Sequence, residues 1–174
     1  MVLWIIGLSG VGKTTLAQQV TARLRQSRDN VVMLDGDVMR ALFPQDVDHT
    51  VAGRRRNAER ISALSRFLDS QGINVVAAVL SIFPEWQQWN RDNFGEYVEV
   101  YLKASVDTLA RRDIKNLYGP ARRGEMPNVV GIDIPFPEPA RPDLVLDNEA
   151  DRAELAEFVD RIFALPALRR LTAA

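Results

Sequence analysis

Residues 7–14 carry the side chains best suited to chemistry. They read Gly7-Leu8-Ser9-Gly10-Val11-Gly12-Lys13-Thr14 and match the pattern G-x-x-x-x-G-K-[ST]. Glycines let the main chain turn tightly and aim successive N–H groups at phosphate oxygens. A helix that begins at the end of the segment adds the positive end of its dipole. The Lys13 ammonium can then reach the terminal phosphates and the Thr14 hydroxyl can ligate Mg²⁺, so the segment predicts a nucleoside triphosphate site.

A pair of carboxylates follows the second apolar run of the chain. Asp35 and Asp37 flank Gly36 directly after residues 31–34. In a parallel sheet this position lies in the crevice beside the triphosphate site, where ligands bind. One of the two carboxylates can hold Mg²⁺ through water, while the other accepts or orients a hydroxyl proton. The same residues also fit an Asp-Gly turn in which Asp37 caps a helix running toward Leu42.

The motifs that the chain lacks distinguish between classes of triphosphate-binding protein. A regulatory GTPase should carry Asn-Lys-x-Asp, which is missing, and the Asp69-Ser70-Gln71-Gly72 segment is typical of a helix end. A mechanical ATPase should close an apolar strand with an acid, but the run that ends at Leu80 is followed by Ser81. Acids after the second strand favour a small kinase.

A helix predicted over residues 51–71 carries unexpected polar side chains on its apolar face. At 100° per residue, Arg54 and Asn57 fall within the apolar stripe that includes Ile61, whereas Arg55, Arg56 and Arg60 fall outside it. We therefore interpret Arg54 and Asn57 as substrate contacts, with helix capping or ion pairing as the alternative. The three arginines outside the stripe are expected to be solvated.

Short apolar runs alternate with helical patterns along the whole chain. Strands are predicted at Val2 to Ile6, Val31 to Leu34, Ile73 to Leu80, Tyr97 to Leu102 and Asp143 to Leu146, and helices at 13–26, 51–71, 84–93 and 105–112. A last helix carries the stripe Leu155, Phe158, Val159, Ile162 and Phe163. This alternation predicts one α/β domain over residues 1–174, a doubly wound parallel sheet of about five strands with helices on both faces.

Residues 113–140 interrupt this alternation because glycines and prolines accumulate there. Basic residues in the segment suggest a lid over phosphates, and a surface loop without function is the alternative.

Composition excludes several functions. The formal net charge is −1, which does not suit a nucleic-acid binder, and the absence of cysteine excludes disulfides. We expect no membrane association, because no apolar run approaches the ~20 residues of a bilayer span.

The amino end lacks the features of a secretory leader, so the expected compartment is the cytoplasm. A homodimer is compatible with the sequence, and the single His49 is expected to be exposed and without chemistry.

With these residues identified, the chain resembles the adenylylsulfate kinase family over nearly its whole length. The matching segments are Gly7–Thr15, Leu34–Asp37 with Arg40, Arg54-x-x-Asn57, Arg112-Asp113-x-Lys115-x-Leu117-Tyr118, Ala121-Arg122-x-Gly124-Glu125, Gly131-Ile132-Asp133 and Pro142-Asp143-Leu144. The resemblance implies transfer of the γ-phosphate of MgATP to the 3′-hydroxyl of adenosine 5′-phosphosulfate (APS), a step of sulfate assimilation.

The resemblance also implies roles for individual residues. It extends the ATP site over Gly7, Leu8, Ser9, Gly10, Val11, Gly12, Lys13, Thr14 and Thr15. It also makes Asp37 the catalytic carboxylate beside Lys13, which leaves Thr14 and Asp35 as the expected ligands of Mg²⁺. Its implied substrate contacts are Asp37, Arg40, Arg54, Asn57, Ser81, Lys115, Gly131, Ile132 and Asp133. Ser81 aligns with a serine that the family records as a phosphoserine intermediate, although direct in-line transfer needs only positioning and charge neutralisation.

Departures from the family pattern concentrate on the side of the acceptor. They are Val38 in place of an amide, Ile82 and Pro84 after Ser81, Gly119 and Pro120 in place of two lysines, and Val129 in place of an aromatic that stacks on the adenine. Stacking of one base on an aromatic ring contributes ~1–3 kcal/mol to the free energy of binding. The chain therefore also resembles the branch of this family that includes cytidine diphosphoramidate kinase of surface-polysaccharide pathways. A third alternative is a catalytically weak nucleotide-binding module, against which the retained Lys13, Thr14, Asp35 and Asp37 argue.

Overall fold

A computed structural model of the chain describes residues 1–45, 48–150 and 155–173. Its centre is a sheet of five strands in the order β2-β3-β1-β4-β5, and all neighbouring strands are parallel. The strands are β1 (Val2–Ile6), β2 (Val31–Asp35), β3 (Asn74–Val79), β4 (Tyr97–Lys103) and β5 (Leu144–Asp147). Because the strands are parallel, all of their carboxyl ends meet at one edge of the sheet.

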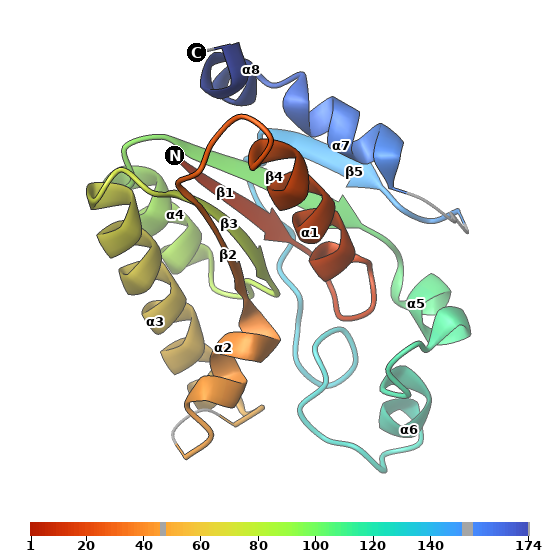
Figure 1. The fold of residues 1–174 in the computed structure, drawn as a ribbon. Helices are drawn as coiled ribbons and strands as arrows, with labels where there is room; N and C mark the ends of the chain where they lie inside the picture. The colour runs from red at the N-terminus through yellow and green to blue at the C-terminus, as the bar shows by residue number, and fades with distance from the viewer. Residues whose placement is uncertain (46–47, 151–154, 174) are drawn as a thin grey trace.

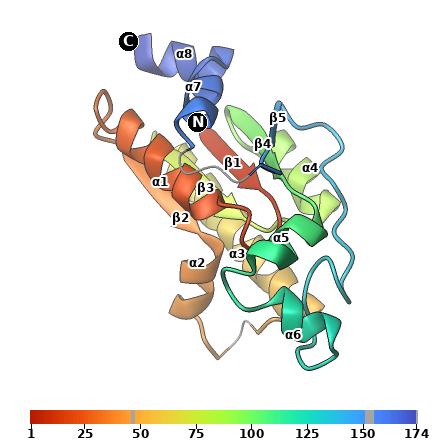
Figure 2. The same ribbon diagram turned by 90° about the vertical axis from the view of Figure 1, so that its right-hand side faces the viewer.

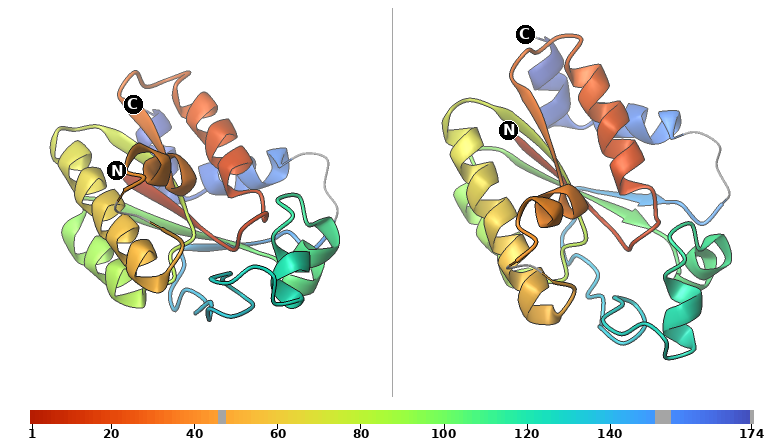
Figure 3. Two further views of the ribbon diagram at one scale, coloured as in Figure 1. Left: turned by 90° about the horizontal axis from the view of Figure 1, so that it is seen from below. Right: turned by 60° about the horizontal axis from the view of Figure 1, so that its bottom comes forward.

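Helices cover both faces of this sheet, as Figures 1 and 3 show. One face carries α1 (Lys13–Leu24), α7 (Ala156–Phe163) and α8 (Pro166–Ala173), and the other carries α3 (Val51–Ser70) and α4 (Pro84–Asn93). Three short helices lie beyond the carboxyl ends of the strands (Figures 1 and 2): α2 (Gly36–Leu42), α5 (Val106–Arg112) and α6 (Tyr118–Arg122).

The buried strand β1 shows how the sequence produces two cores. Its side chains alternate in direction, so Leu3 and Ile5 pack in the cluster that includes helix α1 residues, whereas Val2, Trp4 and Ile6 pack with Ile61 of α3 and with Phe94. All five β1 residues are buried. A strand buried on both faces needs a continuous apolar run, which is what residues 2–6 supply.

The predicted α/β architecture is confirmed, and each predicted strand and helix is present within a few residues of its expected bounds. The apolar stripe from Leu155 to Phe163 is buried as expected. In the described part of the chain, no helix is long and apolar enough to cross a membrane.

Helices α6 and α8 were not predicted. In α6 the Asp113 carboxylate accepts hydrogen bonds from the N–H groups of Leu117 and Tyr118 at 2.7 and 3.0 Å, which caps the helix. Pro120 is tolerated because it lies in the first turn, where N–H groups have no partner within the helix. The segment 113–140 is therefore not wholly irregular. In α8, Pro166 occupies the first position, where a proline starts a helix rather than breaking one.

Candidate active site

The glycine-rich segment connects the end of β1 to the first turn of α1. A Cβ on Gly7 would lie 2.4 Å from the carbonyl oxygen of Leu102, so only glycine fits there. Gly12 has φ 101°, a conformation that side chains disfavour, and α1 begins at the next residue. The segment therefore forms a cradle at the amino end of α1, as the sequence predicts.

Two side chains from distant segments fix this cradle. The Tyr118 hydroxyl of α6 donates to the carbonyl of Ser9 at 2.9 Å, and the buried Asn148 amide donates to the carbonyl of Val11 at 2.9 Å. Sequence reasoning assigned neither contact. Asn148 directly follows β5, so its place at the carboxyl edge of a parallel sheet could have pointed to it.

Lys13 lies within the cradle, where its ammonium donates to the carbonyl of Leu8 at 2.8 Å. Burial and the nearby Lys115 ammonium lower the pKa of Lys13 to about 8, although Asp37 and Asp35 act in the opposite direction. A negatively charged phosphate in the cradle would favour the protonated form.

This lowered pKa predicts that the affinity for ATP depends on pH. Below pH 8 the free protein already carries the Lys13 ammonium, whereas above pH 8 the amine must take up a proton before it can pair with phosphate. We therefore expect KM for ATP to rise about tenfold for each pH unit above about 8. Initial rates between pH 6.5 and 9.5 measure this rise, and a KM for ATP that stays constant over that range would contradict it.

Thr14 and Asp35 lie together, as predicted for two ligands of one metal ion. The Thr14 hydroxyl donates to Oδ2 of Asp35 at 2.7 Å, beside the cradle. The other carboxylate oxygen, Oδ1, accepts from the N–H groups of Asp37 and Val38. Asp35, and not Asp37, therefore caps helix α2. This cap fixes a carboxylate oxygen beside the cradle, and a hard oxygen ligand at this place suits a divalent cation.

Asp37 points instead toward the lid, where its Oδ2 accepts from the Lys115 ammonium at 2.6 Å. Partial burial acts to raise the pKa of Asp37, but the bond to Lys115 and the charges of Lys13 and Arg40 outweigh it and hold the pKa below its ordinary value. Asp37 is therefore ionised at neutral pH and can accept a hydrogen bond from a hydroxyl group.

A central cavity of about 780 Å³ joins the cradle to the cleft between α2, α3 and the lid. Its donor half is lined by Ser9, Gly10, Gly12, Lys13, Thr14, Thr15 and Asp35. Its acceptor half is lined by Asp37, Arg40, Arg54, Asn57, Ser81 and Lys115 among others. Most of the predicted site residues therefore share one cavity, although they come from distant parts of the sequence.

The predicted substrate contacts in the acceptor half also hold the cavity wall in place. Arg40 donates to the carbonyl of Asp48. Arg54 donates to the carbonyls of His49 and Asn128 at 2.9 and 2.8 Å, which joins the start of α3 to a loop over 70 residues away. Asn57 donates to the carbonyl of Gly36 at 3.0 Å, and within the described residues its buried Oδ1 has no partner.

Of the three arginines outside the α3 stripe, Arg56 is exposed as expected, whereas Arg55 and Arg60 also contact other side chains. Arg55 forms an ion pair with Glu85 at 2.5 Å and lies over the Phe83 ring, 4.4 Å from its centroid. Arg60 lies over the Phe43 ring at 4.7 Å. Long apolar stems and flat guanidinium groups let both side chains cover aromatic rings, and the exposed Arg55 keeps its charge near water.

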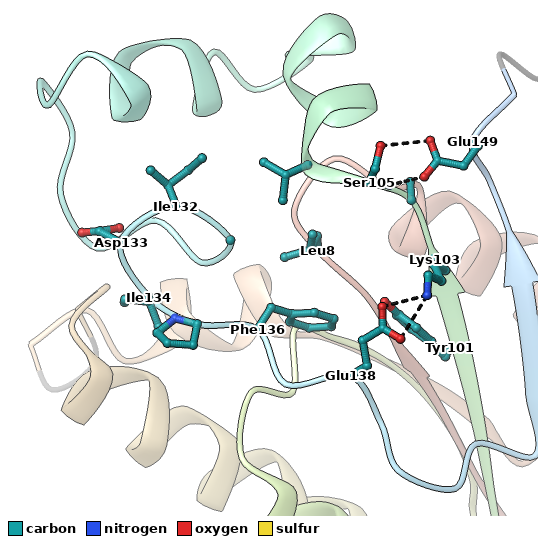
Figure 4. A pocket seen from close by; sticks show the side chains of 14 residues that line it. Leu8, Tyr101, Lys103, Ser105, Ile132, Asp133, Ile134, Phe136, Glu138 and Glu149 are labelled. Carbon is teal, nitrogen blue, oxygen red and sulfur yellow. Dashed lines mark hydrogen bonds and ion pairs between the residues drawn. The ribbon is translucent and has the colours of Figure 1, made fainter.

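Gly131, Ile132 and Asp133 line a second cavity, of about 480 Å³, and not the central one. Figure 4 shows this cavity between the loop over residues 131–138, the side chain of Leu8 and the end of β4. The Asp133 carboxylate accepts from the N–H groups of Asn128 and Val129, each at 2.5 Å. Asp133 therefore holds the loop whose carbonyl at Asn128 contacts Arg54. The ion pair Lys103–Glu138 and the Ser105–Glu149 hydrogen bond close the far side (Figure 4).

Four aromatic side chains line the central cavity, and the sequence analysis assigned none of them to it: Trp4, His49, Phe83 and Trp86. Val129 is buried and lines neither cavity, which leaves no aromatic ring at that position. Burial and the charges of Arg40 and Arg54 lower the pKa of His49, so its ring is neutral at pH 7. His49 lies between two arginines predicted to bind substrate, and that signal could have identified it.

Arg54 offers a test of the cavity wall. Arg54→Ala removes both carbonyl contacts and a cation of the acceptor half, so we expect KM for the acceptor to rise at least tenfold while KM for ATP stays within about twofold. Arg54→Lys keeps the charge but cannot donate in two fixed directions, so it should restore the acceptor KM only in part. Initial rates with varied acceptor measure these changes, with Arg56→Ala on the exposed side of α3 as the control. Equal acceptor KM values for Arg54→Ala and Arg56→Ala would contradict the prediction.

The fold and the cradle together define a P-loop kinase. A parallel sheet ordered 2-3-1-4-5 carries the cradle after its central strand, and the edge strand β2 ends at Asp35, two residues before Asp37. The sequence model of the adenylylsulphate kinase family matches residues 1–147. The chain belongs to that family, and it is an ATP-dependent kinase.

Individual relatives agree with this assignment. The chain is 39% identical over 165 residues to a probable adenylyl-sulfate kinase of Bacillus subtilis, an alignment that covers 91% of this chain and 84% of the relative. It is 35% identical over 167 residues to the cytidine diphosphoramidate kinase of Campylobacter jejuni, covering 96% of each. The structure of an APS kinase of Mycobacterium tuberculosis in complex with AMPPNP and APS superposes with a TM-score of 0.83 at 29% identity, covering 99% of this chain and 97% of that one.

Proposed function

We propose that this protein transfers the γ-phosphate of ATP to the ribose 3′-hydroxyl of adenosine 5′-phosphosulfate. One observation carries the proposal: the phosphate cradle and a cationic acceptor wall line the same cavity, with the ionised Asp37 carboxylate also on its wall. Relatives named adenylyl-sulfate kinase and a superposable APS kinase bound to AMPPNP and APS support the choice of acceptor. The proposed unit is a single domain over residues 1–174 with a lid at 113–140, acting in the cytoplasm.

In this proposal each group of the cavity has a distinct task. The cradle and Lys13 hold the β- and γ-phosphates, and Mg²⁺ held by Thr14 and Asp35 would neutralise charge on them. Arg40, Arg54 and Asn57 bind the acceptor so that its hydroxyl meets the γ-phosphate in line. Asp37 accepts the proton of that hydroxyl, and Lys115 moves from Asp37 to the phosphates as the acceptor arrives.

Cytidine diphosphoramidate is a second candidate acceptor. The observation that favours it is the buried Val129, because the acceptor half lacks the aromatic ring that would stack on adenine at that position. The chain also aligns over 96% of its length with a cytidine diphosphoramidate kinase. Both candidates are small anionic nucleotides, so the same cationic wall suits either of them.

The release of ADP from MgATP, measured against a panel of acceptors, tests the proposal. The panel contains APS, cytidine diphosphoramidate, AMP and CMP, and we expect the highest kcat/KM with APS. A higher value with cytidine diphosphoramidate would transfer the assignment to the second candidate. No turnover with any nucleotide, despite measurable ATP binding, would instead favour a nucleotide-binding module without kinase activity.

A further inference from the structure

Ser81 adopts an unusual backbone conformation at the end of β3. Its φ is 55°, in the left-handed region that residues other than glycine rarely occupy, and it lines the central cavity. Such strain persists only where the surrounding contacts hold it in place. Ser81 therefore has a specific partner that fixes it at the carboxyl edge of the sheet.

The partner is Gln87 of helix α4, whose side chain is buried. Its amide nitrogen lies 3.0 Å from the carbonyl oxygen of Ser81 and 3.3 Å from the Ser81 hydroxyl oxygen. A carbonyl oxygen can only accept, so the group of Gln87 that faces Ser81 is its NH₂. This NH₂ donates to both the carbonyl oxygen and the hydroxyl oxygen of Ser81.

This arrangement determines the direction in which the Ser81 hydroxyl can donate its hydrogen bond. Because its oxygen already accepts from Gln87, its own hydrogen is directed elsewhere, and the residue borders the cavity. Within residues 1–45, 48–150 and 155–173, no carboxylate or imidazole accepts a hydrogen bond from it. A serine nucleophile needs such a base to remove its proton. Ser81 is thus arranged to donate a hydrogen bond and is not arranged to attack phosphorus.

We propose that Gln87 is a positioning residue, which orients the Ser81 hydroxyl as a hydrogen-bond donor toward the anionic group of the acceptor nucleotide. The inference rests on the function proposed above and assigns Ser81 to acceptor binding. Together with Arg40 and Arg54, the hydroxyl supplies a donor for an oxygen that carries negative charge. The contact exists equally before and during phosphoryl transfer, so it acts on acceptor KM and not on kcat.

Removing the hydrogen-bond donor at residue 87, or replacing it by an acceptor, tests the proposal. Gln87→Ala removes the orienting group and should raise KM for the acceptor roughly fivefold. Gln87→Glu replaces the donor by an acceptor, so the Ser81 hydroxyl turns toward residue 87 and presents a lone pair to the anion. We expect Gln87→Glu to raise KM for the acceptor roughly fiftyfold, with KM for ATP and kcat within about twofold of wild type. At lower pH the introduced carboxyl group takes up a proton and can donate again, so the defect should shrink between pH 8 and pH 6.

Gln88→Glu is the matched control, because it makes the same change one residue further on, at an exposed side chain that contacts Asp92 and Arg141. It should leave acceptor KM unchanged. If Gln87→Glu equals Gln87→Ala in acceptor KM at every pH, the orienting role is wrong. Mass spectrometry of the wild-type protein after incubation with MgATP is a test that does not depend on the folding of these variants. Phosphate found on Ser81 would overturn its role as a hydrogen-bond donor.

The outcomes separate this inference from the proposed function. The kinetics are measured with the panel nucleotide that wild type uses best. Turnover of a nucleotide other than APS would correct the proposed acceptor. The Gln87 inference would then be tested by the KM values of the variants for that nucleotide. Turnover of APS without the expected order of the Gln87 variants would overturn the Gln87 inference alone. No turnover of any nucleotide would overturn both.

Discussion

Replacing Asp37 by alanine is expected to lower kcat for phosphoryl transfer by roughly 10²- to 10⁴-fold, the usual contribution of a positioned general base. The Asp37 carboxylate is ionised, lines the same cavity as the cradle and contacts the lid through the ammonium of Lys115. ATP affinity should therefore stay within about threefold of wild type, because the groups of the cradle are unchanged. Single-turnover rates measure the loss, and equilibrium binding of ATP shows that the donor side is intact.

Asp37→Asn is the control for shape, since its amide keeps the size of the side chain but accepts a proton poorly. It should be as inactive as the alanine variant. Asp35→Asn changes the other acid of the pair and should act differently, because Asp35 contacts Thr14 and caps α2. We expect its effect to diminish at high Mg²⁺ concentration. Turnover of Asp37→Ala at the wild-type rate would remove Asp37 from its catalytic role.

Replacing Lys13 by alanine is expected to lower kcat/KM for ATP by roughly 10³-fold, whichever nucleotide accepts the phosphate. Its ammonium is held within the cradle by the carbonyl of Leu8, so it is already positioned when the triphosphate arrives. Removing one preorganised donor of this kind typically lowers kcat by about 10²- to 10³-fold. The loss should be the same with APS and with cytidine diphosphoramidate, because Lys13 belongs to the donor half.

Lys103→Ala is the matched control, since Lys103 ends β4 and pairs with Glu138 on the side of the second cavity. It should leave kcat/KM for ATP within about twofold. A Lys13→Ala enzyme that keeps wild-type turnover would contradict the assignment of residues 7–14 as the phosphate cradle. A loss seen with only one acceptor would place Lys13 in the acceptor half instead.

The sequence was sufficient for the sheet and the cradle because both depend on local patterns. Five apolar runs predicted five strands, and a parallel sheet necessarily brings Gly7, Asp35 and Ser81 to one edge. The stripe on α3 likewise identified Arg54 and Asn57, since a polar group on an apolar face points inward. The periodicity of apolar residues in the sequence is enough to predict which segments are strands and which side chains of a helix point inward.

Contacts between distant segments could not be predicted in the same way. Tyr118 reaches Ser9, Asn148 reaches Val11 and Lys115 reaches Asp37 only once the lid has folded over the sheet. The resemblance grouped Gly131 to Asp133 with the substrate contacts, whereas the fold turns them toward the second cavity. A motif states which residues occur together but not the direction in which a loop presents them.

The lid is attached to the rest of the molecule at both of its ends. At its start, α6 is bonded to the cradle through Tyr118 and Ser9. At its end, Arg91 of α4 donates to the carbonyl of Arg141, and the Asp143 carboxylate accepts from the N–H group of Glu99. A segment held at both ends cannot rotate outward about a single hinge. The lid residues that line the central cavity are Ile114, Lys115 and Leu117, which directly precede Tyr118. Outward movement of this wall would therefore pull on the hydrogen bond from Tyr118 to Ser9, so that opening of the acceptor cleft disturbs the phosphate cradle as well.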